Sequence, residues 1–377
     1  MPQPELPALP RLGRVEAIHV RMPFRRPLLD ATGEFTHRRS WLLRLVDADG
    51  NEGLGEATLS PFAADVTTGS LAMLIRAIVP ELAAGRSAFW PELTVEGEPG
   101  RAAMAAVDGA IGALTAARAV AAAGTGDDAP PAMWIPVGAA IPFAGPDAGA
   151  EAAAQAVELG FGTLKLRAGF ERATDQLVDR LRAIRAAVGP EPSLRVDVGG
   201  AWDLETAAER IAAIAPFRIE YVEQPLAAWD IAGHAALRER VRVPIALDES
   251  VDAEGSARAA LAERAADVLI VKPARVGGHA ATMRIVEAAT AAGGSVVLGT
   301  YFETGVGIAA VLRIAATLPT PRGGRPAHGL ATAGVLVHDL LRAPLPIEKG
   351  RMTVPAAVTL DESEVDRYTL ERFEARG

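Results

Sequence analysis

The chain has 377 residues, half of them hydrophobic and 23% charged, so it can bury a core over two or three domains, and wholesale disorder is excluded. Its net charge of -9 argues against a nucleic acid or an anionic membrane as the main partner, because both attract basic patches. The absence of cysteine excludes disulfides, thiolate chemistry and cysteine-ligated zinc.

Residues 1–130 predict an α+β domain. The proline-rich residues 1–10 predict a loose tail, and they lack the basic head and apolar stretch of a signal peptide. Between residues 14 and 56 we expect β-structure. It includes a strand at 41–46 and a short strand at 53–56, separated by the turn residues Asp, Gly and Asn.

Helices are expected over residues 65–124, with a break marked by proline and glycine around 90–100. The alanine-rich stretch 102–124 contains two charged residues and is too weakly apolar to span a bilayer. It therefore predicts a buried helix, and a cytoplasmic location follows. Residues 124–131, rich in glycine, aspartate and proline, predict a linker.

Residues 131–342 predict a barrel of alternating strands and helices. Short apolar runs alternate with alanine-rich helical segments, a pattern typical of right-handed parallel crossovers, and eight such units favour a closed barrel over an open sheet. The predicted strands are 134–141, 163–167, 194–198, 219–223, 244–248, 268–272, 295–300 and a weaker one at 328–332. The predicted helices include 148–159, 171–188, 205–215 and 282–292. Residues 343–377 are expected to pack back on the first domain.

Three consecutive predicted strands end in a carboxylate: Asp197, Glu223 and Asp248, spaced 26 and 25 residues apart. One βα unit per spacing places them side by side on the C-terminal face, where such barrels carry their active sites. Three uncompensated carboxylates would repel one another, and a hard divalent cation such as Mg²⁺ removes that conflict. The alternative is that each acid only caps the helix that follows it.

Three cations end other predicted strands. Lys165 and Arg167 alternate with leucines that should pack against the helices, so both cations should point into the barrel mouth. Lys272 follows the apolar run 268–271 on the opposite side. The alternative is that these cations only neutralise the carboxylates.

Two other features of the sequence give weaker indications of function. Residues 305–310 (GVGIAA) match a loose dinucleotide fingerprint, but no acid lies between Glu303 and Asp339 to bind a ribose. The start of a helix there could instead hold a substrate carboxylate. The six histidines show no metal-ligand spacing, and most are expected at surface or packing positions.

Four stretches resemble motifs of the enolase superfamily, in its muconate-lactonizing subgroup: LRVDVGGAW, YVEQPL, PIALDES and VKPARVGG. The resemblance covers nearly the whole chain. Two later stretches, ETGVGIAAVLRIAATLP and AHGLATAGVLVHDLL, are similar to the o-succinylbenzoate synthase family, and KPARVGG is also similar to racemases of N-acylamino acids.

This resemblance implies an α/β fold: a TIM-like (β/α)8 barrel, in the modified (β/α)7β form, with an N-terminal α+β capping domain. The three strand-end carboxylates would bind Mg²⁺. Lys272 would be the sixth-strand lysine that faces the substrate, while Lys165 and Arg167 would occupy the K-x-K site of the second strand. The implied reaction removes a proton next to a carboxylate and passes through an enediolate stabilised by Mg²⁺, after which a β-hydroxyl leaves.

Two positions depart from the family pattern. The second lysine of K-x-K, the usual base, is Arg167, whose pKa above roughly 12 makes it a poor base. The usual asparagine two residues after the first metal ligand is Gly199. Racemisation, which needs an acid–base group on each face of the substrate, is therefore disfavoured. Dehydration needs only one base, which Lys272 or Lys165 could supply if neighbouring cations lower its pKa.

We therefore predict a Mg²⁺-dependent dehydratase of the o-succinylbenzoate synthase type, a lyase of menaquinone biosynthesis, with a rearranged base. Arg167 would bind a substrate carboxylate through two hydrogen bonds. The alternatives are another cycloisomerase, dehydratase or N-acylamino acid racemase of the superfamily, and a catalytically silent paralogue that binds metal and carboxylate. The expected partner is a small carboxylate substrate, shaped by loops at 30–37 and 59–62, and the alanine-rich barrel exterior is compatible with a homo-oligomer.

Overall fold

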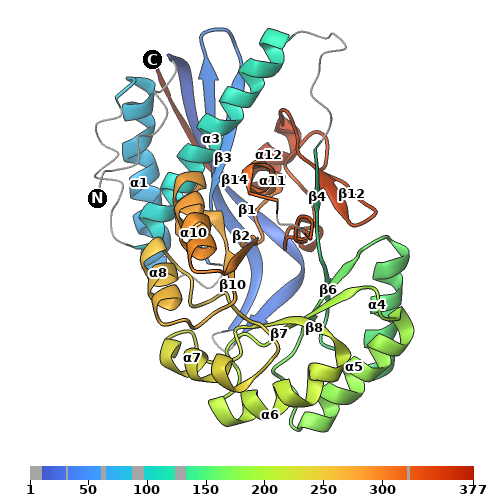
Figure 1. Ribbon diagram of the computed structural model, residues 1–377. Helices are drawn as coiled ribbons and strands as arrows, with labels where there is room; N and C mark the ends of the chain where they lie inside the picture. Colours follow the sequence, from blue (N-terminus) through green and yellow to red (C-terminus); the bar gives the residue numbers. More distant parts are fainter. Residues whose placement is uncertain (1–10, 31–32, 61–64, 87–96, 124–132, 321–322) are drawn as a thin grey trace.

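The computed structural model describes residues 11–30, 33–60, 65–86, 97–123, 133–320 and 323–377. The expected tail and linker lie outside the described residues, as do residues 90–96 of the helix break and parts of the two loops expected over the barrel mouth. An antiparallel sheet flanked by helices stands at one end of a curled parallel sheet with its own helices (Figure 1).

The capping part is a four-stranded antiparallel sheet in the order β14-β1-β2-β3. Its strands are β1 (Leu12–Asp30), β2 (Gly33–Asp47), β3 (Glu52–Ala57) and β14 (Thr369–Arg376), the last from the C-terminal segment. The run WLLRLV in β2 is apolar except for Arg44 because both faces of the sheet are covered. Trp41 and Leu43 join a core with the helices of the capping part, whereas Leu42 packs with Val306 and the C-terminal segment.

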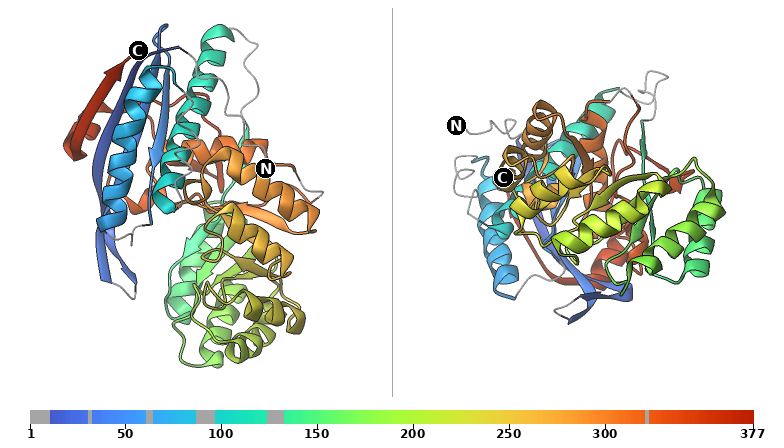
Figure 2. Two further views of the ribbon diagram at one scale, coloured as in Figure 1. Left: turned by 90° about the vertical axis from the view of Figure 1, so that its left-hand side faces the viewer. Right: turned by 60° about the horizontal axis from the view of Figure 1, so that its bottom comes forward.

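Two helices cover one face of this sheet, α1 (Asp65–Ala83) and α3 (Glu98–Ala123) (Figure 2). Helix α3 lies so close to β3 that a Cβ atom at Gly55 would overlap the carbonyl of Ala106. By length and hydropathy alone, stretches of both helices could cross a membrane, a test that core helices also pass. One face of each helix, with residues such as Ile75 and Ala106, is buried against the sheet, which favours the interpretation as core helices.

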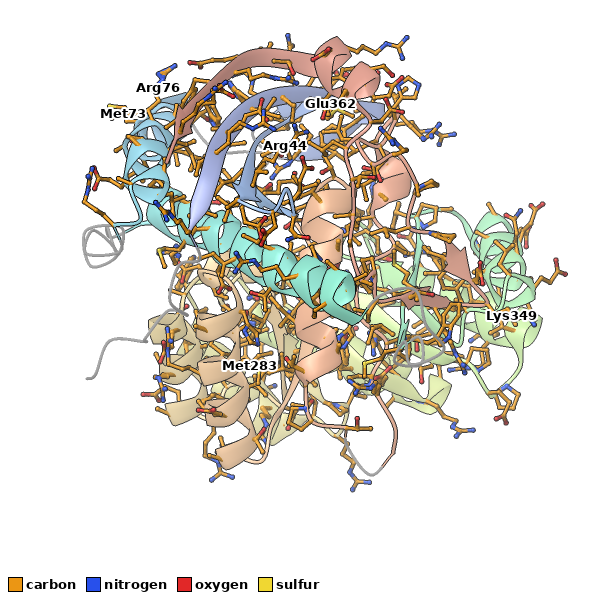
Figure 3. All side chains as sticks on the ribbon, turned by 90° about the horizontal axis from the view of Figure 1, so that it is seen from above. Arg44, Met73, Arg76, Met283, Lys349 and Glu362 are labelled. Carbon is orange, nitrogen blue, oxygen red and sulfur yellow. The ribbon has the colours of Figure 1, made fainter. Side chains whose placement is uncertain are left out.

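The C-terminal segment also contacts the capping sheet through α12 (Glu362–Tyr368). Arg44 of β2 forms ion pairs with Glu16 of β1 at 3.1 Å and with Glu362 of this helix (Figure 3). A short hairpin of β12 (Ile347–Glu348) and β13 (Arg351–Thr353) instead pairs with β4 (Trp134–Pro136) beside the barrel.

The barrel sheet has seven parallel strands in the order β11-β10-β9-β8-β7-β6-β5. The strands are β5 (Ala139–Ile141), β6 (Thr163–Arg167), β7 (Ser193–Asp197), β8 (Ile219–Glu223), β9 (Ile245–Leu247), β10 (Val268–Val271) and β11 (Ser295–Leu298). Every strand contributes buried apolar residues, such as Leu166 of β6 and Val196 of β7, which fits a sheet enclosed by its own helices.

The barrel helices follow the strands in chain order. They are α4 (Pro146–Glu158), α5 (Thr174–Val188), α6 (Leu204–Ile214), α7 (Ile231–Arg240), α8 (Glu254–Ala262), α9 (Pro273–Val276), α10 (His279–Ala291) and α11 (Gly305–Thr317), with short 3-10 turns at Ala215–Phe217 and Ala333–Val335. Helices α6 and α7 begin at aspartate caps, where Asp203 accepts the N–H of Thr206 and Asp230 accepts that of Gly233.

Two predicted strands need correction. The eighth strand, at 328–332, is wrong: His328 and Gly329 form only single parallel bridges, to Val137 and to Gly299, and these close the barrel. The first predicted strand, 134–141, is divided. Its beginning, β4, pairs antiparallel with β13 outside the barrel, and only β5 joins the parallel sheet.

Candidate active site

Five of the six predicted site residues stand at or just after the C-terminal ends of barrel strands, and Lys165 lies two residues before the end of β6. The strand register places Arg167, Asp197 and Glu223 side by side on β6, β7 and β8. Asp248 follows β9, and its backbone N–H donates to the side-chain oxygen of Gln224 at 3.0 Å. Lys272 follows β10 and is the N-cap residue of α9. The charged residues near the ends of these strands thus meet at one face of the barrel.

The six side chains form two neighbouring sets of ion pairs. The Lys165 Nζ lies 2.7 Å from Glu223 Oε1 and 3.0 Å from Asp197 Oδ2, so it bridges two strands. Arg167 Nη1 lies 2.8 Å from the other Asp197 oxygen. On the next strands, Lys272 Nζ donates to both oxygens of Asp248, each at 2.6 Å.

Of the three acids, Glu223 has the least favourable environment for its ionised form. Its side chain is buried, and its Oε2 has no hydrogen-bond partner among the residues that the structure describes. Burial raises the pKa of Glu223 to about 8, in spite of the Lys165 ammonium group beside it. A cation bound to this carboxylate would therefore stabilise its ionised form.

The three carboxylates are suitable ligands for a hard divalent cation, but they are not arranged around a common metal position. Within the described ranges, no group of three or more histidine, cysteine, aspartate or glutamate side chains is placed to hold a metal ion as it stands. The ammonium groups of Lys165 and Lys272 instead form ion pairs with the three acids. The donor set nevertheless suits Mg²⁺, because it offers only carboxylate oxygens from neighbouring strands, one of them buried and unpartnered.

The expectation that neighbouring cations lower a lysine pKa is wrong for this arrangement. Burial opposes the charged form of Lys272, but Asp248 and Tyr301 outweigh it and raise the pKa of that lysine. Burial is outweighed more strongly at Lys165, where Asp197 and Glu223 raise the pKa well above its usual range. Each lysine must part from its carboxylate before it can act as a base.

The two departures from the family pattern meet in space. A Cβ atom at position 199 would lie 2.5 Å from Arg167 Nη2 and 2.8 Å from its Nη1, too close for either atom to stay. Gly199 also has φ +61°, a conformation that glycine adopts without strain. The guanidinium of Arg167 therefore occupies the space that a side chain at 199 would take.

Aromatic rings that sequence analysis did not single out complete the mouth. Tyr301 lies with its ring centroid 5.0 Å from Lys272 Nζ, and Phe170 lies 5.6 Å from the Arg167 guanidinium carbon. Phe170 is largely exposed and packs edge-on against Phe143. The only signal in the sequence was position, since Tyr301 and Phe170 each follow a predicted strand by a few residues.

The start of α11 does not offer the site for a substrate carboxylate that the sequence suggested. The N–H groups of Thr304 and Gly307 donate to Glu56 of the capping sheet, at 3.1 and 3.0 Å to its Oε2. The N–H of Gly305 donates to Asp339 at 2.8 Å. These protein carboxylates satisfy the helix end and fasten the capping sheet to the barrel.

Comparisons with known proteins agree with the geometry. The sequence profile of the enolase C-terminal domain-like family matches residues 148–363. The chain is 41% identical to o-succinylbenzoate synthase of Thermobifida fusca over 228 residues, 59% of this chain and 68% of that protein. It is 34% identical to N-succinylamino acid racemase of Thermus thermophilus over 195 residues, 52% of this chain and 50% of that protein.

Among solved structures, the muconate lactonizing enzyme from Pseudomonas fluorescens, in complex with muconolactone, is 26% identical with a TM-score of 0.78. The match covers 96% of this chain and 100% of that one. The barrel with its capping sheet is thus similar over its full length to an enzyme of known structure.

Proposed function

Because the chain belongs to the enolase C-terminal domain-like family of the enolase superfamily, we propose that it is a Mg²⁺-dependent dehydratase of the o-succinylbenzoate synthase type, acting in menaquinone biosynthesis. One observation carries this proposal: three strand-end carboxylates and two lysines converge on one face of the barrel. Proton abstraction next to a carboxylate requires both positive charge near that carboxylate and a base near the carbon.

In this proposal Asp197, Glu223 and Asp248 hold the metal ion. When bound, Mg²⁺ supplies positive charge at the substrate carboxylate and so makes the neighbouring C–H more acidic. Glu223 Oε2, which has no partner among the described residues, and the raised pKa of this acid support the role, because a divalent cation satisfies the oxygen and favours the ionised acid.

Lys272 is the proposed base. It contacts a single carboxylate, that of Asp248, whereas Lys165 bridges two, so Lys272 is the lysine that is freed by the movement of one side chain. Once Asp248 has turned away, the neutral Nζ takes the proton from the carbon next to the substrate carboxylate. Lys272 then returns this proton to the β-hydroxyl, which leaves as water. The result is a syn dehydration.

Arg167 is the proposed anchor for a second carboxylate of the substrate. Its side chain is 41% exposed at the mouth, fixed on one side by Asp197 and lying near the Phe170 ring. A guanidinium stays protonated at neutral pH and can bind a carboxylate through two parallel hydrogen bonds. A fixed cation on this face of the substrate disfavours racemisation there.

Racemisation remains the second candidate, because Lys165 and Lys272 both reach the barrel mouth and a relative is named N-succinylamino acid racemase. The two reactions differ in what happens after proton removal. A dehydratase consumes the substrate and releases water, whereas a racemase returns the substrate with a solvent proton and inverted configuration.

The test is turnover of the cyclohexadiene precursor of o-succinylbenzoate by Mg²⁺-loaded enzyme, followed by absorbance, and deuterium uptake from D2O by N-succinylamino acids. Dehydration of the precursor without inversion of amino acids supports the proposal. Inversion without dehydration favours the racemase. No turnover and no deuterium uptake across a panel of carboxylates, in a folded and Mg²⁺-loaded sample, would identify a silent paralogue instead.

A further inference from the structure

A cavity of about 520 Å³ lies where helices of the capping part and of the barrel meet. Helix α3 contributes one wall, and α10 and α11 contribute the others; Figure 3 shows α3 crossing above α11, with Met283 on α10 nearby. Most of the lining is small or apolar, as at Ala105, Ile111 and Ile314. None of the six candidate active-site residues lines this cavity.

Arg313 of α11 brings an unpaired cation to this apolar space. Its Nε, Nη1 and Nη2 are all buried and have no hydrogen-bond partner among the described residues. Burial alone lowers the pKa of Arg313 to about 10, so the group is still charged at neutral pH. A buried charge without a partner is costly, and native structures normally pair it.

The acids that also line the cavity are engaged elsewhere. Asp108 accepts the backbone N–H of His279 at the start of α10. Glu56 accepts the N–H groups that open α11. Glu303 accepts the N–H of Tyr301 through Oε2, and its Oε1 has no hydrogen-bond partner among the described residues. No ion pair joins any of them to Arg313 within the described part of the chain. The positive charge therefore remains available to a ligand.

We propose that this cavity binds a small amphipathic anion, whose acid group pairs with Arg313 and whose apolar body fills the space between α3, α10 and α11. The volume lies within the range of about 300–1,000 Å³ that is typical of small-molecule sites. A guanidinium pairs with a carboxylate through directed, charge-assisted hydrogen bonds, and the apolar lining favours an aliphatic chain over a polar ligand. Because both the capping part and the barrel line the cavity, the bound ligand joins them.

The test uses octanoate as the probe, with binding measured by calorimetry and the melting temperature measured in parallel. We expect one octanoate per chain, a rise in melting temperature, and at least about tenfold weaker binding of 1-octanol, which lacks the charge. Arg313→Gln should weaken octanoate binding at least about tenfold, and Arg313→Lys should retain part of the affinity. Arg182→Gln, at an exposed arginine of α5, is the matched control and should bind as the unaltered chain does.

A second variant tests the cavity itself rather than the charge. A Cβ atom at Gly112 of α3, which lines the cavity, meets no atom within 4 Å, so Gly112→Leu starts its side chain in open space. It should reduce octanoate binding while the protein stays folded by circular dichroism. The proposal is overturned if octanoate does not bind saturably, or if both Arg313→Gln and Gly112→Leu bind it unchanged. It is also overturned if Arg313→Gln instead dissociates an oligomer in sedimentation experiments, which would assign the cavity to a second copy of the chain.

Discussion

Two buried carboxylates, one in the capping sheet and one in the barrel, differ in their hydrogen-bond donors and in the direction of their pKa shifts. Asp47, at the end of β2, accepts the N–H groups of Asp49 and Asn51, the amide of Asn51, and the Arg118 Nε at 2.6 Å. Although burial opposes its charge, these donors lower the pKa of Asp47 to about 2. Glu223, at the end of β8, has one oxygen without a partner in the described structure, and its pKa is raised to about 8.

The contrast distinguishes a carboxylate that serves the fold from one that serves a ligand. A structural acid is surrounded by donors that favour its ionised form, and the protein gains stability from the arrangement. An acid that is left short of donors in a buried position costs stability, and such groups are typical of sites that bind a cation or a substrate. The predictions below test whether this difference corresponds to different roles.

The largest effect is expected from the proposed base. Lys272→Ala should lower turnover of the carboxylate substrate by about 1,000-fold, because a positioned general base contributes roughly 10²–10⁴-fold. Single-turnover kinetics and deuterium uptake at the carbon next to the carboxylate measure this directly. Lys349→Ala, at an exposed lysine of the C-terminal segment, is the control. If Lys272→Ala remains active while Lys165→Ala is inactive, the assignment of the base is wrong.

The next effect concerns Glu223, whose Oε2 has no hydrogen-bond partner among the described residues. Glu223→Gln removes one negative charge from the proposed metal site and should weaken Mg²⁺ binding by about 100-fold, measured by calorimetry and by the loss of Mg²⁺-dependent thermal stabilisation. Glu205→Gln, at an exposed acid that pairs with Arg240, should bind Mg²⁺ normally. If Glu223→Gln and the unaltered chain bind Mg²⁺ with equal affinity, Glu223 is not a metal ligand.

A smaller effect should follow when the space beside Arg167 is filled. Gly199→Asn places a side chain where the Arg167 guanidinium lies, so we expect KM to rise about tenfold with a lesser change in kcat. Combining it with Arg167→Lys, which shortens the cation, should restore part of the affinity, and the double-mutant cycle should show coupling between the two positions. Additive effects of the two substitutions would show that the contact carries no function.

The smallest effect on activity is expected at the structural acid. Asp47→Asn should leave turnover unchanged but lower the free energy of unfolding by about 1–3 kcal/mol at pH 7. Because the folded pKa of Asp47 is lowered to about 2, its contribution is complete above the pKa of the unfolded state, near 4, and is lost as the pH falls towards 2. Urea unfolding at pH 7 and pH 3 should therefore show a larger difference between the two proteins at pH 7. A difference that does not depend on pH would contradict this account.

Much of the barrel and the meeting of the candidate residues could be predicted, because both follow from local sequence. A strand buried on both sides is an apolar run, and a charge that ends such a run must reach the end of the barrel, as Asp197 and Lys272 do. The eighth strand could not be placed in this way. The segment at His328 closes the barrel through single bridges, which leave no periodic pattern in the sequence.

Contacts between distant residues were beyond sequence reasoning. Gly199 and Arg167 each departed from the family pattern, but only coordinates show that one makes room for the other. That Arg313 has no partner in the described part of the chain likewise depends on three helices that are separate in the sequence. One further signal was present in the composition. The chain has only three lysines among its 38 basic residues, and two of them are Lys165 and Lys272. Lysine can lose its proton where arginine cannot, so its use at these strand ends is informative.

The convergence of the three strand-end acids on one divalent cation is tested most directly by diffraction from crystals soaked in Mn²⁺, recorded near the manganese edge. The account predicts one anomalous peak at the barrel mouth, about 2.0–2.3 Å from oxygens of Asp197, Glu223 and Asp248, with the ammonium groups of Lys165 and Lys272 moved away from those oxygens. A peak bound by fewer than two of these acids, or no peak in crystals that remain well ordered, would contradict it.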